Sequence, residues 1–252
     1  MKTTVCALFA LLLLWGCQKE VSYEGGVPPT IRKCIDCPYL PICDSSQFVY
    51  VNTSARGVDT VRSVVHVLGD TVINGQQYNS VSAFGAFSNG LYYNCPNAEY
   101  RAFLQTAGLG INIDSALHAL TQQMPNLPAN LIHVPDRYLA TILKANANVG
   151  DTWTDTVYSV SLPAVASALV AMDYTLQEKG ISYTVLGNNY SNVMHVKAVM
   201  RLNVSSLIQL PPVPQVNVTT DYYLSKGVGL IEMKVTNNGN TQLLSQLFSY
   251  HL

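Results

Sequence analysis

The stretch Met194-His195-Val196-Lys197-Ala198-Val199-Met200-Arg201-Leu202-Asn203-Val204 decides the fold class of this protein. Every even-numbered residue in it is apolar, whereas the polar residues His195, Lys197, Arg201 and Asn203 are all odd-numbered. Successive side chains of a strand point to opposite faces, so this alternation places one face on a core and the other in water. The segment therefore predicts a strand of an antiparallel sheet.

The rest of the chain carries similar signals, because Asn, Thr and Ser combined with Val and Tyr favour strands and turns over helices. One short helix is expected over residues 114–121, where Asp114 can act as the N-cap. The apolar stretch 162–172 fits either a helix or a buried strand. We predict a mainly β fold of antiparallel sheets from two related meander units, with one or two short helices and a curved, half-barrel-like sheet.

Two halves of the sequence resemble each other in order, which suggests an internal repeat. Residues 59–64 match 155–160, residues 75–81 match 187–193, and Tyr92-Tyr93 matches Tyr222-Tyr223. Asn74-Gly75 and Leu186-Gly187-Asn188 are typical of hairpin turns, since Gly and Asn tolerate positive φ. We therefore expect a first β unit at 34–103, a connecting segment with the helix at 104–148, and a second β unit at 149–252.

Composition excludes two classes of protein. The 252 residues are 48% hydrophobic and only 12% charged, and 14 Lys and Arg nearly balance 15 Asp and Glu. A nucleic-acid-binding protein needs a basic surface, which this balance does not supply. Abundant apolar residues with a small net charge also argue against a disordered chain. No nucleic-acid partner is expected.

The N-terminus has the layout of a signal peptide. Lys2 precedes an eleven-residue apolar run from Val5 to Trp15, which is too short to span a bilayer. Its end, Leu14-Trp15-Gly16-Cys17, resembles the lipobox of bacterial lipoproteins, except that Trp15 is larger than the residue usual there. This resemblance implies cleavage after residue 16, lipid attachment at Cys17, and a flexible tether over 17–33. An ordinary secretory signal is the alternative.

Four cysteines remain after Cys6 in the signal and Cys17 at the lipid site, namely Cys34, Cys37, Cys43 and Cys95. An even number in an oxidising compartment predicts two disulfides, and one of them must reach Cys95 if that residue is paired. The pairing is left open by the sequence. A four-thiolate zinc site lacks the usual second close pair, and a redox Cys-x-x-Cys is disfavoured by Pro38 and Pro41. We expect neither a metal nor a cofactor.

Several short motifs together resemble uncharacterised Bacteroidota lipoproteins. They are the lipobox, Cys-x-x-Cys-Pro-Tyr-Leu-Pro-x-Cys at 34–43, Gly-Asp-Thr-Val-Ile-Asn-Gly at 69–75, Val-Gly-Asp-Thr-Trp at 149–153 and Tyr-Tyr-Leu-Ser-Lys-Gly-Val-Gly-Leu-Ile at 222–231. The last segment is also similar to strands of envelope proteins of the lipoprotein-carrier type. The resemblance implies an outer-membrane lipoprotein, periplasmic or surface-exposed, with a β fold, and it provides no catalytic residue.

No catalytic constellation is found in the sequence, so no catalytic residue is proposed. The five histidines show no paired spacing, and the P-loop, Gly-x-Ser-x-Gly and His-Glu-x-x-His motifs are absent. An acid/base pair of Asp151 with Asp155 is conceivable, although a turn role for such residues is more common. Tyr92, Tyr93, Tyr222 and Tyr223 could form a platform for stacking a sugar, but strand aromatics more often belong to a core.

The leading functional hypothesis is a non-enzymatic envelope lipoprotein with a binding or structural role. It would be held to the membrane by its N-terminal lipid and would bind a protein, glycan or lipid. One alternative is a carrier or sensor of a hydrophobic ligand in a β-sheet groove. The other is a glycan-binding or glycan-acting surface protein.

Overall fold

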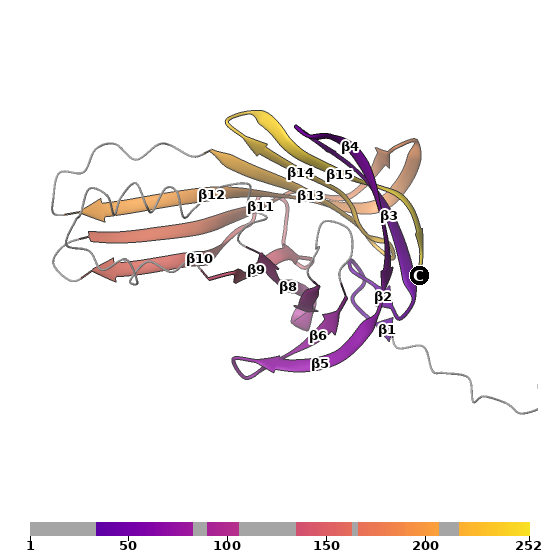
Figure 1. Ribbon diagram of the computed structural model, residues 1–252, viewed down its shortest axis with the longest axis horizontal. Coiled ribbons are helices and arrows are strands. Elements are labelled where there is room, and N and C mark those ends of the chain that lie inside the picture. Colours follow the sequence, from indigo (N-terminus) through magenta and orange to yellow (C-terminus); the bar gives the residue numbers. More distant parts are fainter. Residues whose placement is uncertain (1–33, 83–89, 106–134, 163–165, 207–216) are drawn as a thin grey trace, which may run out of the picture. The chain divides into compact units, whose positions relative to one another are not determined.

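The computed structural model describes residues 34–82, 90–105, 135–162, 166–206 and 217–252 (Figure 1). Most of these residues lie in strands of three antiparallel sheets, which have eight, five and two strands. The predicted mainly β fold is therefore confirmed. The expected helix over 114–121 lies outside the described residues. In the described part, the only helical turn is η2 (Pro96–Ala98), and no helix there is long and apolar enough to cross a membrane.

The eight-stranded sheet combines both ends of the described chain. Its order is β10-β11-β12-β13-β14-β15-β3-β4, and every neighbouring pair is antiparallel. The strands are β10 (Thr152–Leu162), β11 (Ala166–Val185), β12 (Asn188–Ser206), β13 (Val218–Ser225), β14 (Gly229–Asn237), β15 (Asn240–His251), β3 (Ser46–Ser54) and β4 (Gly57–Val65). Strand β15 pairs with β3, the first long strand, so these two distant segments are neighbours in the sheet.

The five-stranded sheet is a meander, and a small hairpin precedes β3. The meander consists of β5 (Val67–Ile73), β6 (Gln76–Val81), β7 (Leu91–Asn94), β8 (Glu99–Gln105) and β9 (Arg137–Lys144), and the hairpin of β1 (Cys34–Ile35) and β2 (Ile42–Cys43). The predicted unit 34–103 thus contributes strands to all three sheets. The predicted unit 149–252 contributes only to the eight-stranded sheet, and the domain boundaries themselves stay a prediction.

The chain passes directly from the eight-stranded to the five-stranded sheet at His66, the one residue between β4 and β5 (Figure 1). The carbonyl of Val65 accepts a hydrogen bond from the Ser45 amide at 2.8 Å, and that of His66 accepts one from the Ser82 amide at 2.9 Å. Neighbouring residues of an extended chain direct their backbone groups to opposite edges. The chain therefore exchanges its partner β3 for β6 on the other edge at this point.

Strand β12 has the predicted alternation. Val196 and Ala198 are completely buried and Met200 is nearly so, whereas Arg201 is exposed. The apolar stretch 162–172, which could have been a helix or a strand, ends β10 and begins β11 in its described residues. The face of a strand that packs on the core carries apolar residues and the face in water carries polar ones, so a period-two pattern in the sequence indicates which residues are buried.

Both predicted hairpin turns are present. Asn74 and Gly75 connect β5 to β6 with φ of 51° and 76°, and Leu186 and Gly187 connect β11 to β12 with φ of 46° and 83°. Two consecutive residues at positive φ make the turn whose twist matches the flanking strands. The repeated segments 59–64 and 155–160 lie in β4 and β10, and they pair differently. Strand β10 pairs with the strand that follows it, β11, whereas β4 pairs with the strand before it, β3, and not with β5.

Tyrosine forms much of the interior. Tyr50, Tyr78, Tyr93, Tyr100 and Tyr174 are among the largest fully buried side chains. A buried phenol needs a hydrogen-bonding partner, and backbone carbonyls supply it in two cases. The Tyr50 hydroxyl donates to the Leu230 carbonyl at 2.8 Å, and that of Tyr93 donates to the Leu40 carbonyl at 3.4 Å. These contacts join segments that are distant in sequence.

Candidate functional site

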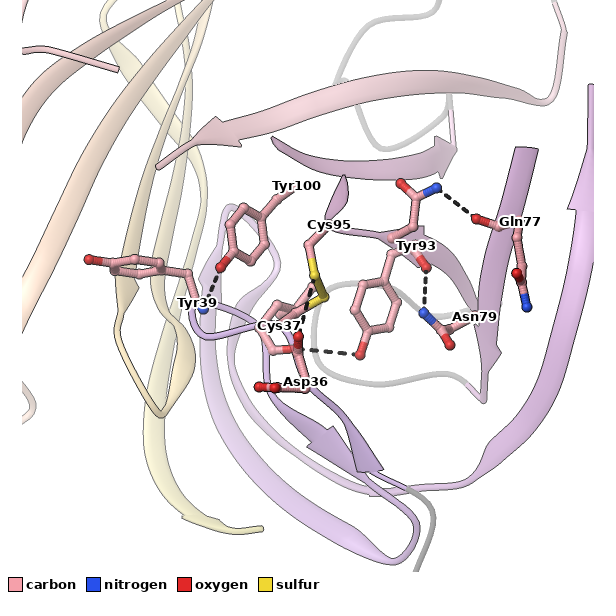
Figure 2. The surroundings of a disulfide bond; sticks show 10 residues. Asp36, Cys37, Tyr39, Gln77, Asn79, Tyr93, Cys95 and Tyr100 are labelled. Carbon is pink, nitrogen blue, oxygen red and sulfur yellow. Dashed lines mark hydrogen bonds between the residues drawn. A yellow bond between two sulfur atoms is a disulfide. The ribbon is translucent and has the colours of Figure 1, made fainter. Parts of the chain in front are cut away.

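The four cysteines form the two predicted disulfides. Cys34 pairs with Cys43 across the β1–β2 hairpin, and Cys37 pairs with Cys95, 58 residues away, just after β7 (Figure 2). The expected connection between the N-terminal cysteine cluster and Cys95 is therefore present. With all four sulfurs joined in pairs, no thiolate among them is left to bind zinc.

Buried hydrogen bonds hold the hairpin to the five-stranded sheet beside the long-range disulfide. The Tyr39 amide donates to the Tyr100 hydroxyl at 3.0 Å, as Figure 2 shows. The rings of these two residues meet edge to face, with 6.0 Å between centroids. Burial raises the pKa of Tyr93 and of Tyr100 above the ordinary value of a phenol. The turn that follows Cys95 is thus fixed by covalent and noncovalent contacts together.

A cavity of about 550 Å³ lies where the end of β9, the start of β8 and the start of β10 meet. We call it the junction cavity. Its lining consists of Asn97, Ala98, Glu99, Lys144, Asn146, Ala147, Gly150, Asp151, Thr152 and Trp153. Most of these residues are polar or very small, so the cavity presents hydrogen-bonding side chains and accessible backbone.

One wall is the tight turn after the long-range disulfide. Asn97 and Ala98 both adopt positive φ, of 53° and 63°. Asn tolerates this left-handed conformation, but alanine rarely adopts it, and such backbone persists only where surrounding contacts impose it. The Cys37–Cys95 bond and a 2.9 Å hydrogen bond from the Ala145 amide to the Ala98 carbonyl are those contacts.

A second wall is the loop at 145–151 between β9 and β10. Lys179 of β11 donates its Nζ to the carbonyls of Ala145 and Ala147 at 3.0 and 2.9 Å. The Gly150 amide donates to the Leu176 carbonyl at 2.8 Å. The Asp151 carboxylate accepts from the Asn148 amide at 2.8 Å, so this aspartate has the turn role that its sequence suggested. Hydrogen bonds from β11 and one within the loop therefore hold the loop in one shape.

The charged groups of the cavity neutralise one another. Glu99 forms ion pairs with Arg101 and, at 3.4 Å, with Lys144. The hydrogen bond from Arg101 is the largest influence on the Glu99 carboxyl and lowers its pKa, with Lys144 adding to the effect. Lys144 also places its Nζ 5.8 Å from the centroid of the Trp153 ring. The ionised carboxylate of Glu99 is therefore a stable part of the wall.

Trp153 forms the aromatic part of the lining. Its indole Nε1 donates to the Thr141 carbonyl at 2.6 Å, and its ring stacks on Tyr174 with 5.7 Å between centroids. These contacts fix the orientation of the ring, which is only 9% exposed. The cavity therefore has one rigid aromatic element among its polar groups.

The conceivable acid/base pair of Asp151 and Asp155 is divided between two environments. Asp151 lines the cavity, but Asp155 does not and instead accepts hydrogen bonds from the backbone amide and the hydroxyl of Thr141. Burial raises the pKa of Asp155, and the bonds from Thr141 partly oppose that shift. Its carboxylate is thus used in joining β10 to β9.

The four tyrosines predicted as a sugar platform lie on two different sheets. Tyr93 and Tyr222 are core side chains, 1% and 5% exposed, and burial raises the pKa of Tyr222 to about 12. Tyr92 is half-buried, with the Arg137 guanidinium 5.1 Å from its ring centroid. Tyr223 is half-buried and stacks on Tyr183 and His195. The structure therefore does not bring the four rings onto one surface.

A second polar cluster lies across strands β11 to β15. The Tyr223 ring stacks on Tyr183 and on His195, with centroid separations of 4.0 and 4.3 Å. The two nitrogens of His195 face Asp221 at 2.8 Å and Glu178 at 3.2 Å. The alternation predicts that His195 faces water, but its side chain is only 14% exposed, because side chains of the flanking strands β11 and β13 cover it.

The same cluster contains a buried carboxylate. Glu232 is only 6% exposed and accepts hydrogen bonds from the Tyr183 hydroxyl at 2.9 Å and from Gln246 at 2.8 Å. Burial and the neighbouring Glu232 carboxylate raise the pKa of Tyr183. Every polar group named in this cluster has a partner, so the cluster fits a structural role.

The sequence does not predict the junction cavity as a site. The motif at 149–153 supplies part of its lining, whereas no sequence motif marks Asn97, Lys144 and Asn146. The Asn- and Gly-rich run ending at Trp153 was the available signal. Among the described residues, no group of His, Cys, Asp and Glu could hold a metal ion. Cys17, the predicted lipid site, lies outside the described residues.

Comparisons with known proteins give two structural likenesses. No protein-family model and no curated protein matches the sequence. A "putative lipoprotein" from Parabacteroides distasonis ATCC 8503 is 13% identical and gives a TM-score of 0.44, with 86% of this chain and 100% of that one covered. A "putative exported protein with YmcC-like fold" from Bacteroides fragilis NCTC 9343 is 11% identical and gives a TM-score of 0.37, with 83% and 96% covered. At this degree of similarity, neither neighbour carries a functional conclusion over to this chain.

Proposed function

We propose that this protein is a lipid-anchored envelope protein that binds a small polar ligand in the junction cavity without converting it. The observation that carries the proposal is a cavity of about 550 Å³ with a polar lining, whose turns are held by backbone hydrogen bonds. That volume lies within the range of small-molecule sites, which combine a largely preformed shape with a few placed polar groups.

Unused hydrogen-bonding capacity supports a binding role. The side-chain amide of Asn97 has no partner among the described residues, and Asn146 uses only its Nδ2, on the Asn97 carbonyl at 3.4 Å. Asp151 uses Oδ2 in its turn. These exposed groups would bond to water in the free protein and to ligand atoms in the complex.

The chemistry of the lining favours binding over catalysis. It contains no Ser, Cys or His, so the usual nucleophiles and the commonest general base are missing from it. The lining has two carboxylates. One of them, Glu99, has a lowered pKa and two cationic partners, so it is a poor proton donor. Asp151 holds the turn. Glycoside hydrolysis requires a general acid of raised pKa, which Glu99 does not supply.

The membrane part of the proposal rests on the sequence around Cys17. An apolar run too short to span a bilayer, followed by Gly16-Cys17, supports lipid attachment at the cysteine. Several acyl chains hold a protein firmly, since each buried CH₂ contributes about 0.8 kcal/mol. Replacing Cys17 by Ser should release the protein from membranes, and membrane retention of this variant would contradict the anchor.

Native mass spectrometry tests the binding role. Protein extracted mildly from its own envelope should carry a small molecule that is lost in the variant Asn146→Trp, which fills the cavity. Asn240→Trp is the matched control, because Asn240 is exposed at the start of β15 and is not part of the lining. Bare wild-type protein, or a ligand that Asn146→Trp retains, would contradict the proposal.

A further inference from the structure

We propose that the ligand of the junction cavity is a neutral carbohydrate. This inference rests on the proposed binding function and names the chemical class of the ligand. It follows from three properties of the cavity, namely the kind of hydrogen-bonding groups, the presence of an aromatic ring and the balance of charge.

The free polar groups match hydroxyls. The amides of Asn97 and Asn146 each offer both a donor and an acceptor, Asp151 offers an acceptor, and Thr152 offers a hydroxyl. A sugar hydroxyl donates and accepts at once, so neighbouring hydroxyls can bond to an amide and to a carboxylate side by side. A ligand with only acceptors, such as a phosphate, would leave the carboxylates unmatched.

The aromatic element of the site is preformed. The N–H of Trp153 is already bonded to the Thr141 carbonyl, Tyr174 stacks on the ring and the Lys144 Nζ lies 5.8 Å from its centroid. The 9% of the residue that is exposed therefore offers a small apolar contact in a fixed orientation. The C–H groups of a sugar ring can pack against such a surface, which buries apolar area without costing a hydrogen bond. A ring immobilised in the free protein also loses little entropy on binding.

Charge balance selects a neutral member of this class. The lining carries Lys144 against Glu99 and Asp151, and Arg101 is paired with Glu99 beside it. Lys179 is directed to the Ala145 and Ala147 carbonyls. No cation is therefore left over for a phosphate or uronate. The polar lining likewise lacks the apolar surface that a lipid chain needs.

Saturation-transfer NMR on the full-length protein tests the inference with defined probes. The neutral probes are glucose, galactose, mannose and N-acetylglucosamine, and the charged ones are glucuronate and glucosamine. At least one neutral sugar should receive saturation at millimolar concentration and should bind more tightly than both charged sugars. Asn97→Gly, chosen because residue 97 has a φ of 53° that glycine tolerates, and Asn146→Ala should each weaken it by about five- to ten-fold, the usual effect of one lost hydrogen bond. Asn240→Ala should leave binding unchanged.

The outcomes separate this inference from the proposed function. If no sugar binds while envelope-extracted protein still carries a ligand that Asn146→Trp removes, the carbohydrate class is wrong and the binding function stands. Tighter binding of glucuronate or glucosamine than of every neutral sugar would overturn neutrality and hence the inference. If neither sugars nor an extracted ligand occupy the cavity, both proposals fail. Unchanged urea unfolding of each variant shows that a lost signal reports on the site and not on the fold.

Discussion

Removing the long-range disulfide should destabilise this protein more than removing the short one. We compare the double variant Cys37→Ala/Cys95→Ala with Cys34→Ala/Cys43→Ala, which delete one bond each and add no buried polar group. The first bond joins the hairpin to the turn that forms a wall of the junction cavity, and the second closes only the hairpin. The two variants therefore have the same chemistry but constrain loops of different length.

The magnitude follows from the length of the closed loops. With a sequence separation of 58, the chain-entropy relation gives about 4.2 kcal/mol for Cys37–Cys95. With a separation of 9, it gives about 2.6 kcal/mol for Cys34–Cys43. The expected difference in the free energy of unfolding is thus about 1.6 kcal/mol. Loss of the contacts around Cys37, which is 1% exposed, would add to the cost of the first variant.

Urea unfolding followed by tryptophan fluorescence measures both values. Trp153 is the only tryptophan after the predicted signal peptide, and it lines the junction cavity, so its emission reports on the region that the long-range bond supports. Free energies are compared after extrapolation to water, because deleting a cross-link also changes the slope. A loss for the Cys34/Cys43 variant equal to or larger than that for Cys37/Cys95 would refute the loop-length reasoning.

Two further predictions concern single side chains. The folded state raises the pKa of Asp155, so it binds more protons than the unfolded chain once the pH exceeds about 3.8. The free energy of unfolding should therefore fall as pH rises from there through the raised pKa, and Asp155→Asn should lack this component in urea titrations at several pH values. An equal slope in both proteins would contradict it. Tyr183→Phe keeps the ring stacked on Tyr223 but removes the hydrogen bond to the buried Glu232 carboxylate, so urea unfolding should show a loss of about 1 to 2 kcal/mol. An unchanged midpoint would show that water replaces the hydroxyl.

The strands were predictable because burial leaves a local record in the sequence. In β12 the residues Met194, Val196 and Ala198 face the core and Arg201 faces solvent, as the alternation indicates. The hairpin turns were equally readable, since Asn74-Gly75 and Leu186-Gly187 need only their own backbone preferences to reverse the chain. The pairing of the strands could not be predicted, because no local feature of the sequence makes β4 pair with β3 and not with β5.

Single side chains show the same limit. Tyr92 and Tyr93 are equivalent in sequence terms, but alternate strand faces put Tyr93 in the core and leave Tyr92 half-buried. His195 occupies the polar face as predicted, yet Asp221 and Tyr223 from β13 enclose it. The environment of a polar residue depends on strands that arrive from elsewhere in the chain.

The sequence by itself determined the β class, the alternation of faces, the hairpin turns and the even set of cysteines that must pair. These follow from local backbone preferences, from the period-two pattern of burial and from the even number of cysteines. Each of them can be read from the sequence without knowing which segments meet in space. Only the tertiary structure decided that Cys37 bonds Cys95 and that Asn97, Lys144 and Trp153 line one cavity. The physical reason is that such a site exists only where β8, β9 and β10 meet, and that meeting is fixed by packing and strand pairing across the whole chain.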